Sequence, residues 1–245
     1  MSIRLHVTAD LVAGAPIALP KEQAHYVANV MRAKAGEDVL VFNGRDGEWR
    51  GRFDAVAKNN VTIALDAQTR PQAAEPDLWL VAAPIKKERI DLVAEKASEL
   101  GASALWPVFT RRTVMSRVNT ERLAAHMVEA AEQCERLTVP VVMEPVPLEK
   151  ALAGWDASRI LLFLDETGTG APLAEALSDL PAGPLAVLVG PEGGFAPEER
   201  AALARLSFAK PVSLGPRILR AETAAIAALA IVQAINGDWS RGPRS

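Results

Sequence analysis

Two stretches near the C-terminal end of the chain are the most informative: Val189-Gly-Pro-Glu-Gly-Gly-Phe195 and Leu214-Gly-Pro-Arg-Ile-Leu-Arg-Ala-Glu-Thr-Ala224. Each follows a short apolar run, passes through Gly-Pro and leads into a segment with helical character. Glycine adopts backbone conformations that are closed to other residues and lets a ligand approach the main chain. Ligands of open α/β sheets bind at the carboxyl ends of strands. The two turns therefore predict a pocket in which backbone groups hold a small ligand.

The ligand is not predicted to be a nucleoside triphosphate on a P-loop. Residues 190–194 are glycine-rich, but no Gly-Lys-Ser/Thr follows them. The competing interpretation is that both turns serve folding alone. It is weakened by the polar side chains that crowd behind the second turn, namely Arg217, Arg220, Glu222 and Thr223.

The first part of the chain has the pattern of a small β-barrel. Strands are expected at 39–42, 49–57 and 61–65, a turn at 43–47 and one short helix at 20–31. The segment 70–76 contains two prolines and no periodicity, which is typical of a linker. We therefore expect one domain over residues 1–72 and a second over residues 73–245.

In the second part, strands alternate with helices. The expected strands are 78–83, 105–109, 139–143, 160–164, 185–189 and 212–214. The expected helices are 86–100, 119–137, 171–178, 197–206 and 222–235, with Asn119 or Thr120 capping the second of them. Alternation of this kind predicts a parallel sheet with helices on both faces, an α/β fold.

Composition excludes several classes of protein. Of the 245 residues, 49% are hydrophobic and no apolar run is long enough to span a membrane. The N-terminal segment lacks the apolar region of a signal peptide, and Cys134 is the single cysteine, which together predict a cytoplasmic protein. The three histidines are far apart, so no metal site is expected. The net charge of −3 argues against a passive nucleic-acid coat protein.

Together with other segments, the two Gly-Pro turns resemble those of the SPOUT methyltransferases that methylate uridine N3 in small-subunit ribosomal RNA. The segments that agree, in the expected order, are His25-Tyr-Val-Ala-Asn-Val-Met-Arg-Ala-Lys-Ala-Gly36, Phe42-Asn-Gly44, Glu95-Lys-Ala-Ser-Glu-Leu-Gly101, Pro107-Val-Phe-Thr-Arg-Arg112 and Ala131-Glu-Gln-Cys-Glu-Arg136. The resemblance runs from about residue 20 to Trp239. It implies a PUA-like RNA-binding β-barrel followed by a parallel sheet with a C-terminal trefoil knot.

The resemblance also implies S-adenosylmethionine as the cofactor, bound in the knot. Apolar side chains would wall an adenine slot, and backbone groups of the glycine turns would supply hydrogen bonds. The expected cofactor-binding residues are Leu164, Leu188, Gly190, Glu192, Gly194, Leu214, Gly215, Ile218, Leu219 and Thr223.

Methylation at N3 requires loss of the N3 proton, so a catalytic base or a group that stabilises the anion is expected. Glu222 is the candidate base, and Arg217 or Arg220 would stabilise negative charge on the uracil oxygens. The alternative for Glu222 is a structural role in the first turn of its helix, where a carboxylate is favoured. For Arg220 the alternative is a salt bridge to Glu222 or Glu192.

The expected partners are small-subunit ribosomal RNA and a second copy of the chain. Basic residues cluster in the first domain and recur after the strand at 105–109. The RNA-binding candidates are Arg4, Arg32, Lys34, Arg45, Arg50, Arg111 and Arg112. The resemblance implies a homodimer, because SPOUT enzymes generally pair through helices next to the knot. The helix at 222–235 is apolar around most of its circumference, which predicts burial on more than one side. One side can face the sheet and another a second subunit; the alternative is that helices of the same chain cover both sides.

Two other functions stay open at this point. A SPOUT enzyme could methylate a ribose 2′-oxygen or another base. A chain that has lost catalysis could act as an RNA-binding assembly factor.

Overall fold

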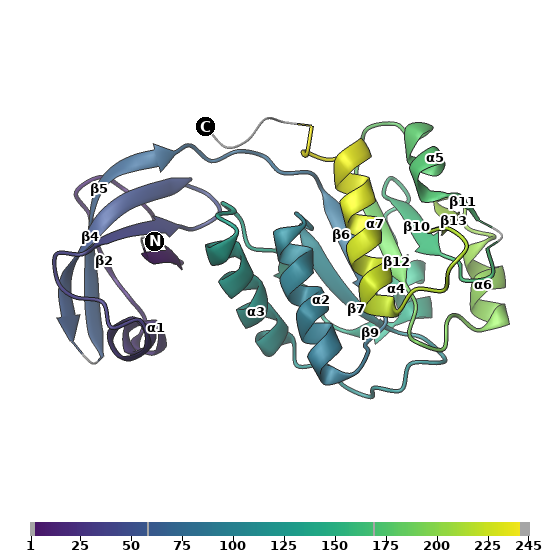
Figure 1. Cartoon of the computed structure of the whole chain (residues 1–245), viewed down its shortest axis with the longest axis horizontal. Helices are drawn as coiled ribbons and strands as arrows, with labels where there is room; N and C mark the ends of the chain where they lie inside the picture. Colours follow the sequence, from purple (N-terminus) through teal and green to yellow (C-terminus); the bar gives the residue numbers. More distant parts are fainter. Residues whose placement is uncertain (1–2, 58, 169, 241–245) are drawn as a thin grey trace. The chain divides into compact units, whose positions relative to one another are not determined.

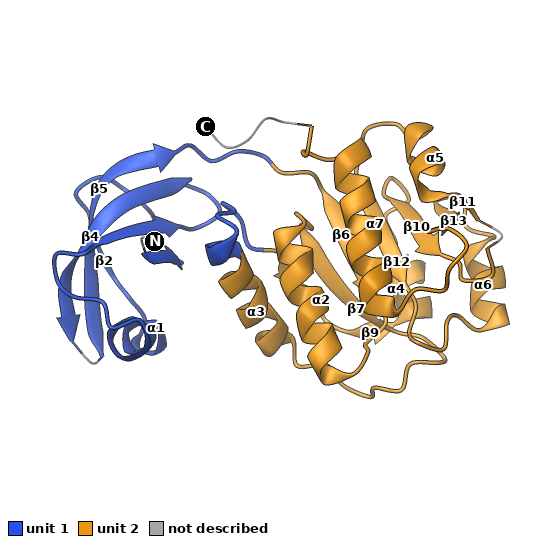
Figure 2. Ribbon diagram, viewed as in Figure 1, with its two compact units in different colours: residues 1–74, 131–139 blue, residues 75–130, 140–245 orange. Residues whose placement is uncertain are grey.

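The computed structural model describes residues 3–57, 59–168 and 170–240 and divides the chain into two compact units. Unit 1 comprises residues 1–74 and 131–139, and unit 2 comprises residues 75–130 and 140–245 (Figure 2). The segment 131–139 differs from the sequence-based expectation, which placed it wholly in the second domain.

Unit 1 is built on a five-stranded sheet with the order β1-β3-β4-β5-β2. The strands are β1 (Ile3–His6), β2 (Pro16–Ala18), β3 (Asp38–Phe42), β4 (Glu48–Ala57) and β5 (Asn60–Arg70). β1 and β3 are parallel, and the other pairs are antiparallel. Every strand and the single helix contribute to one core, which includes Leu5, Ile17, Val27 and Phe53.

The helix of unit 1 departs from the expected single helix. α1 (Lys21–His25) continues directly into a π-helix, η1 (Tyr26–Val30), and the Met31 N–H bonds to the Tyr26 carbonyl, five residues back. Arg32 then adopts a left-handed conformation with φ of +56°. The π-turn places Tyr26 and Val30 on the surface, 42% and 62% exposed, while Val27 enters the core. π-turns of this kind are frequent at functional sites.

Unit 2 is the predicted α/β fold, a parallel sheet with helices on both faces. Its strands follow the order β11-β13-β10-β12-β6-β7-β8, and all of these pairs are parallel. The strands are β6 (Leu78–Ala82), β7 (Ala104–Phe109), β8 (Val141–Val142), β10 (Ile160–Leu164), β11 (Ala171–Pro172), β12 (Leu185–Val189) and β13 (Ala209–Ser213). A short strand, β9 (Val146–Pro147), also pairs with β7.

The helices are α2 (Lys87–Glu99), α3 (Thr120–Gln133), α4 (Leu148–Ala153), α5 (Leu173–Ser178), α6 (Pro197–Leu203) and α7 (Ala221–Ile235). α7 packs against β6, β12, α2 and α5 on one face of the sheet (Figure 1). On the other face, Val81 and Leu188 pack in a core with Ala151 of α4 and Leu203 of α6. Alternate residues along each strand therefore face the two helical layers.

α3 is shorter than expected, and its end explains the placement of residues 131–139. The Asn119 side chain accepts a hydrogen bond from the Arg122 N–H at 2.9 Å and begins the helix, as one of the two predicted caps. Glu135, with φ of +60°, follows the last turn. In unit 1, the Arg4 guanidinium donates hydrogen bonds to the carbonyls of Ala131 and Arg136 at 2.8 and 2.6 Å. These bonds hold residues 131–136 within unit 1.

Among the described residues, no helix is both long enough and apolar enough to cross a membrane.

Candidate functional site

The two Gly-Pro turns lie at one edge of the sheet in unit 2. The first follows β12 and the second follows β13, and both strands are parallel neighbours of β10. Because the carboxyl ends of adjacent parallel strands share an edge, the turns and the end of β10 converge there, as expected. Leu164, the last residue of β10, is half-buried between the two strands that carry the turns.

The first turn, residues 190–195, is stabilised by a hydrogen bond within the turn and by contacts with Glu166 and Arg200. The Gly194 N–H donates to the Pro191 carbonyl at 2.9 Å, and Gly194 has φ of +67°. A side-chain carbon at Gly194 would collide with the Glu166 carboxylate. Arg200 of α6 donates to the Phe195 carbonyl at 2.7 Å and pairs with Glu166 at 3.2 Å. This turn therefore has a rigid, preformed shape.

Leu188 has a different role from the one expected. Its side chain is fully buried in the core beneath the turn, together with Phe195, and the ring of Phe195 contacts Gly190. A buried side chain in this layer supports the turn, so Leu188 does not wall a slot with its side chain.

Arg111 and Arg112, expected to bind RNA, also support the first turn. Arg112 donates to the Gly193 carbonyl at 2.7 Å, and the Arg111 N–H donates to Glu199 at 2.8 Å. The Arg111 side chain pairs with Glu198 at 3.7 Å. Both arginine side chains are exposed, so they lie beside the turn and can still contact a ligand.

The second turn is open to solvent. The Gly215 N–H donates to the Ser213 hydroxyl at 3.1 Å, Gly215 has φ of +97°, and a side-chain carbon there would meet no protein atom within 4 Å. Ile218 is 88% exposed, a high value for an isoleucine. The other predicted cofactor residues of this segment, Leu214, Leu219 and Thr223, range from half-buried to exposed.

Glu222 points inward at the start of α7, whereas the two arginines before it point outward. The Glu222 side chain is only 14% exposed, and Arg217 and Arg220 are exposed. Within the described part of the chain, neither arginine forms an ion pair with Glu222 or Glu192. The predicted alternative for Arg220, a salt bridge to one of these carboxylates, is therefore wrong.

The partner of both carboxylates is Arg89, which the sequence analysis missed. Its Nε lies 3.6 Å from Glu222 Oε1, and its terminal nitrogen lies 4.0 Å from Glu192 Oε1. Glu222 Oε2 is buried and has no hydrogen-bond partner among the described residues. A signal was present in the sequence, because Lys86, Lys87 and Arg89 place positive charge at a helix N-terminus, where the helix dipole disfavours it.

In unit 1 the basic candidates separate into a buried one and several exposed ones. Arg4 is only 7% exposed, pairs with Glu48 at 2.8 Å and stacks its guanidinium over Phe42. Arg4 donates through all three of its side-chain nitrogens to this pair and to the two carbonyls at the end of α3, so the structure gives it a buried, structural role in place of the exposed position expected for an RNA contact.

The remaining candidates of unit 1 are accessible. Arg45 is exposed and pairs with Asp10 at 2.8 Å. The side chains of Arg32, Lys34 and Arg50 form no ion pair within the described residues, and Lys34 and Arg50 are exposed. Tyr26, the exposed aromatic residue that begins η1, lies near Arg32 in sequence and has no local signal that marks it as functional.

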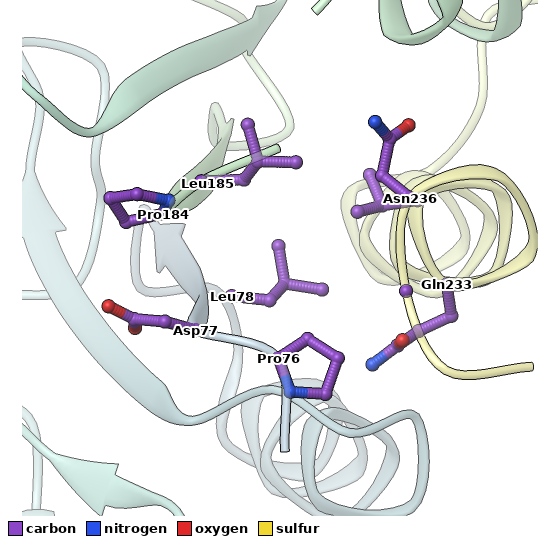
Figure 3. Close-up of a pocket in the computed structure, with 10 residues that line it drawn as sticks. Pro76, Asp77, Leu78, Pro184, Leu185, Gln233 and Asn236 are labelled. Atoms are coloured by element: carbon purple, nitrogen blue, oxygen red, sulfur yellow. The ribbon is translucent and has the colours of Figure 1, made fainter. Parts of the chain in front are cut away.

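The described residues also form a cavity of about 430 Å³ at the opposite edge of the sheet. Figure 3 shows Leu78 and Leu185 at its floor and Gln233 and Asn236 of the α7 end on one side. Burial opposes ionisation of Asp77 at its rim, but hydrogen bonds from Arg159 and Ser103 lower the pKa of this carboxyl. Because the cavity lies at the amino ends of β6 and β12, it is separate from the Gly-Pro turns.

Among the described residues, no group of three or more His, Cys, Asp or Glu side chains is arranged to hold a metal ion.

Comparison with protein families gives two matches that divide the chain. Residues 73–233 match the RNA methyltransferase domain family, and residues 19–66 match the RNA methyltransferase PUA domain family.

Individual relatives agree with the family matches. Ribosomal RNA small subunit methyltransferase E of Rickettsia conorii is 34% identical over 232 residues, covering 94% of both chains. The protein of the same name from Synechocystis is 32% identical and covers 96% of this chain and 78% of its own length.

Solved structures show the same fold over nearly the whole chain. Ribosomal RNA small subunit methyltransferase E of Neisseria gonorrhoeae, solved with S-adenosyl methionine bound, has a TM-score of 0.87 and 26% identity and covers 98% of this chain and 100% of that one. A methyltransferase from Legionella pneumophila, solved with the same cofactor, has a TM-score of 0.87 and 30% identity and covers 97% and 99%.

A family match over more than half of the chain and a relative of this similarity confirm the family that the motifs predicted. The chain belongs to the RNA methyltransferase family that includes ribosomal RNA small subunit methyltransferase E.

Proposed function

We propose that this enzyme transfers the methyl group of S-adenosylmethionine to N3 of a uridine in small-subunit ribosomal RNA. The observation that carries the proposal is the convergence of both glycine turns and Glu222 at one edge of the parallel sheet. The relatives named as ribosomal RNA small subunit methyltransferase E support it, and one protein of that name and a second methyltransferase were solved with this cofactor.

The residues of the edge fit the cofactor. The open space at Gly215 leaves room beside the main chain, and the exposed Ile218 offers an apolar surface for an adenine ring. In the first turn, Gly190 packs against the Phe195 ring and Gly194 against the Glu166 carboxylate, which fixes the shape of the main chain beside this space. The bound cofactor would supply an activated methyl group on a sulfonium, so no metal is needed for the transfer.

The residues of the chain then have to position the uridine and handle its proton. In our proposal, the N3–H proton passes to the Glu222 carboxylate, and the N3 electron pair forms the bond to the methyl carbon. The position of Glu222 at the start of α7, directly after the second glycine turn, supports this role, and 14% of its side chain stays exposed. Arg217 and Arg220 would stabilise negative charge on the uracil oxygens. Both side chains are exposed, and neither forms an ion pair within the described residues.

Incubation of the protein with labelled S-adenosylmethionine and ribosomal small subunits, followed by mass spectrometry of the nucleosides, tests the proposal. We expect 3-methyluridine. A methylated ribose or another methylated base would favour the alternative SPOUT activity. Cofactor binding without any modified nucleoside would favour an inactive assembly factor.

We further propose that residues 1–72 and 73–245 act as an RNA-binding domain and a knotted catalytic domain in the cytoplasm. In the knot, the last strand and the helix that begins near Glu222, α7, would pass through the loop that carries residues 190–195. The return of the chain from β13 to α7, which packs against the more distant β6, is consistent with this path. Because residues 131–139 pack with the first unit, point variants separate the two roles more cleanly than truncation does.

Replacing Arg32 with alanine is expected to weaken RNA binding without changing cofactor binding. Arg32 keeps a left-handed conformation that costs of order 1–3 kcal/mol, and such strain often marks a functional position. Loss of one phosphate contact lowers the slope of log affinity against log salt by about 0.7–0.9. Filter binding at several salt concentrations measures both quantities.

The matched control is Arg52→Ala, which removes an exposed arginine of the same unit that is already paired with Asp38 at 3.3 Å. Equal effects of the two substitutions on RNA affinity would contradict the assignment of Arg32.

We also propose that two copies of the chain form a homodimer. In the single chain, Ile226, Ala227, Ala230 and Ile231 of α7 stay partly exposed, and Ile235, one turn further, is 43% exposed. Light scattering at micromolar concentration is expected to give about twice the chain mass of 26.1 kDa. Ile235→Glu should shift the mass toward the monomer, because a charge in an apolar interface is unfavourable. A wild-type mass equal to that of one chain would refute the dimer.

A further inference from the structure

Arg89 connects the two segments that define the site. It lies in the first turn of α2, directly after the carboxyl end of β6, and contacts Glu222 at the start of α7 and Glu192 in the first glycine turn. Its side chain is 33% exposed, whereas that of Glu222 is 14% exposed. One guanidinium thus sits between two carboxylates that belong to different loops.

The contacts of Arg89 leave one oxygen of Glu222 unused. Arg89 Nε faces Oε1 at 3.6 Å, and Oε2 is the oxygen without a partner among the described residues. A carboxylate with two equivalent free oxygens rotates between orientations, and a nearby cation favours one of them. Arg89 therefore fixes the orientation of the Glu222 carboxylate.

We propose that Arg89 is a positioning residue for methyl transfer, which holds the Glu222 carboxylate in the orientation in which it receives the N3 proton of the target uridine. The inference rests on the proposed function and extends it to a residue outside both glycine motifs.

The charges of the cluster support this role. Before the reaction, Arg89 carries one positive charge beside two carboxylates and a neutral uracil. When the N3 proton moves to Glu222, the carboxylate becomes neutral and the negative charge moves to the uracil, so the total charge beside the guanidinium is constant. Methyl transfer then forms the N3–carbon bond, breaks the sulfur–carbon bond and leaves both products neutral at these atoms. A fixed cation at this position stabilises the negative charge both when it is on Glu222 and when it is on the uracil, and the guanidinium does not have to move between the two.

The test is the kinetics of 3-methyluridine formation on small subunits by Arg89→Gln, Arg89→Lys and the double variant Arg89→Gln/Glu222→Gln. For Arg89→Gln we expect kcat to fall by up to about 100-fold, the effect of a misplaced catalytic group, with unchanged cofactor affinity by calorimetry. Arg89→Lys should recover part of kcat because it restores a cation near Glu222. In the Glu222→Gln background, Arg89→Gln should cause no further loss, since residues that act through one another are not additive.

The matched control is Lys87→Gln, which removes an exposed cation of the same helix turn that has no carboxylate partner among the described residues. Its kcat should equal that of the wild type.

Three results would overturn the inference: a wild-type kcat for Arg89→Gln, fully additive losses in the double variant, or weakened cofactor binding as the main effect. If Arg89→Gln does not fold, the kcat of Arg89→Lys and its coupling to Glu222→Gln carry the test. Failure of the proposed function is separate, because the wild-type enzyme would then form no 3-methyluridine in the same assay.

Discussion

Glu222→Gln is expected to reduce kcat for methyl transfer by about 10²–10⁴-fold, the usual contribution of a general base. Glutamine keeps the size and polarity of the side chain but cannot accept the N3 proton as a carboxylate does. Since Glu222 is largely buried and its Oε2 has no partner among the described residues, the substitution changes chemistry more than packing. Single-turnover methylation of small subunits measures the loss, and calorimetry with the cofactor shows whether binding is intact.

The control addresses the alternative that Glu222 only favours the start of its helix. Glu121 is an exposed carboxylate in the first turn of α3, so Glu121→Gln removes the same interaction with a helix dipole. That interaction is worth about 0.3–1 kcal/mol of stability. If Glu222→Gln lowers stability by this amount and leaves kcat unchanged, Glu222 is a structural residue and the base lies elsewhere.

Gly215→Val is expected to weaken cofactor binding by about 100-fold, or ~2.8 kcal/mol. The branched side chain would enter the open space at the second turn, where no protein atom lies within 4 Å and where we place the cofactor. Calorimetry with S-adenosylmethionine measures the change directly, with no need for RNA.

Backbone strain is the competing cause, and Gly36→Val controls for it. Gly36 and Gly215 have φ of +86° and +97°, and neither has a protein atom near the position of a side-chain carbon. Both substitutions therefore carry a similar cost, roughly 1–2 kcal/mol, for a left-handed residue with a side chain. Equal cofactor affinity in the two folded variants would refute the site.

Gly194→Val is a less informative test of cofactor binding than Gly215→Val, although the sequence predicts a cofactor contact at both glycines. A side chain at Gly194 would collide with the Glu166 carboxylate, which also pairs with Arg200. The variant would disturb the turn with or without a ligand. The sequence identifies both glycines as special, and only the packing shows which one borders open space.

The family and the α/β sheet could be predicted because their signals are local. Glycine and proline determine where the chain turns, and buried apolar runs such as 160–164 and 185–189 coincide with β10 and β12. Short elements without a periodic pattern, including β1, β2, β9 and α4, were not predicted. Two to six residues contain too few positions to show a period, and such elements form because neighbouring parts of the fold cover them.

The roles of individual charged residues depended on contacts that are distant in sequence. Arg4 is a basic residue of the first domain and was therefore a candidate for RNA binding. In the structure its side chain is buried and donates hydrogen bonds to Glu48 and to the carbonyls of Ala131 and Arg136. Arg89 precedes Glu192 and Glu222 by more than a hundred positions along the chain, and no local pattern joins the three.

The sequence alone thus determined the two glycine turns, the parallel α/β class and the family, because motif order and turn chemistry are properties of neighbouring residues. Only the tertiary structure decided which strand ends meet, which cations are buried, and that Arg89 is the partner of both site carboxylates. The physical reason is that strand order and burial are set by long-range packing, in which each side chain's environment is supplied by residues far away in the chain.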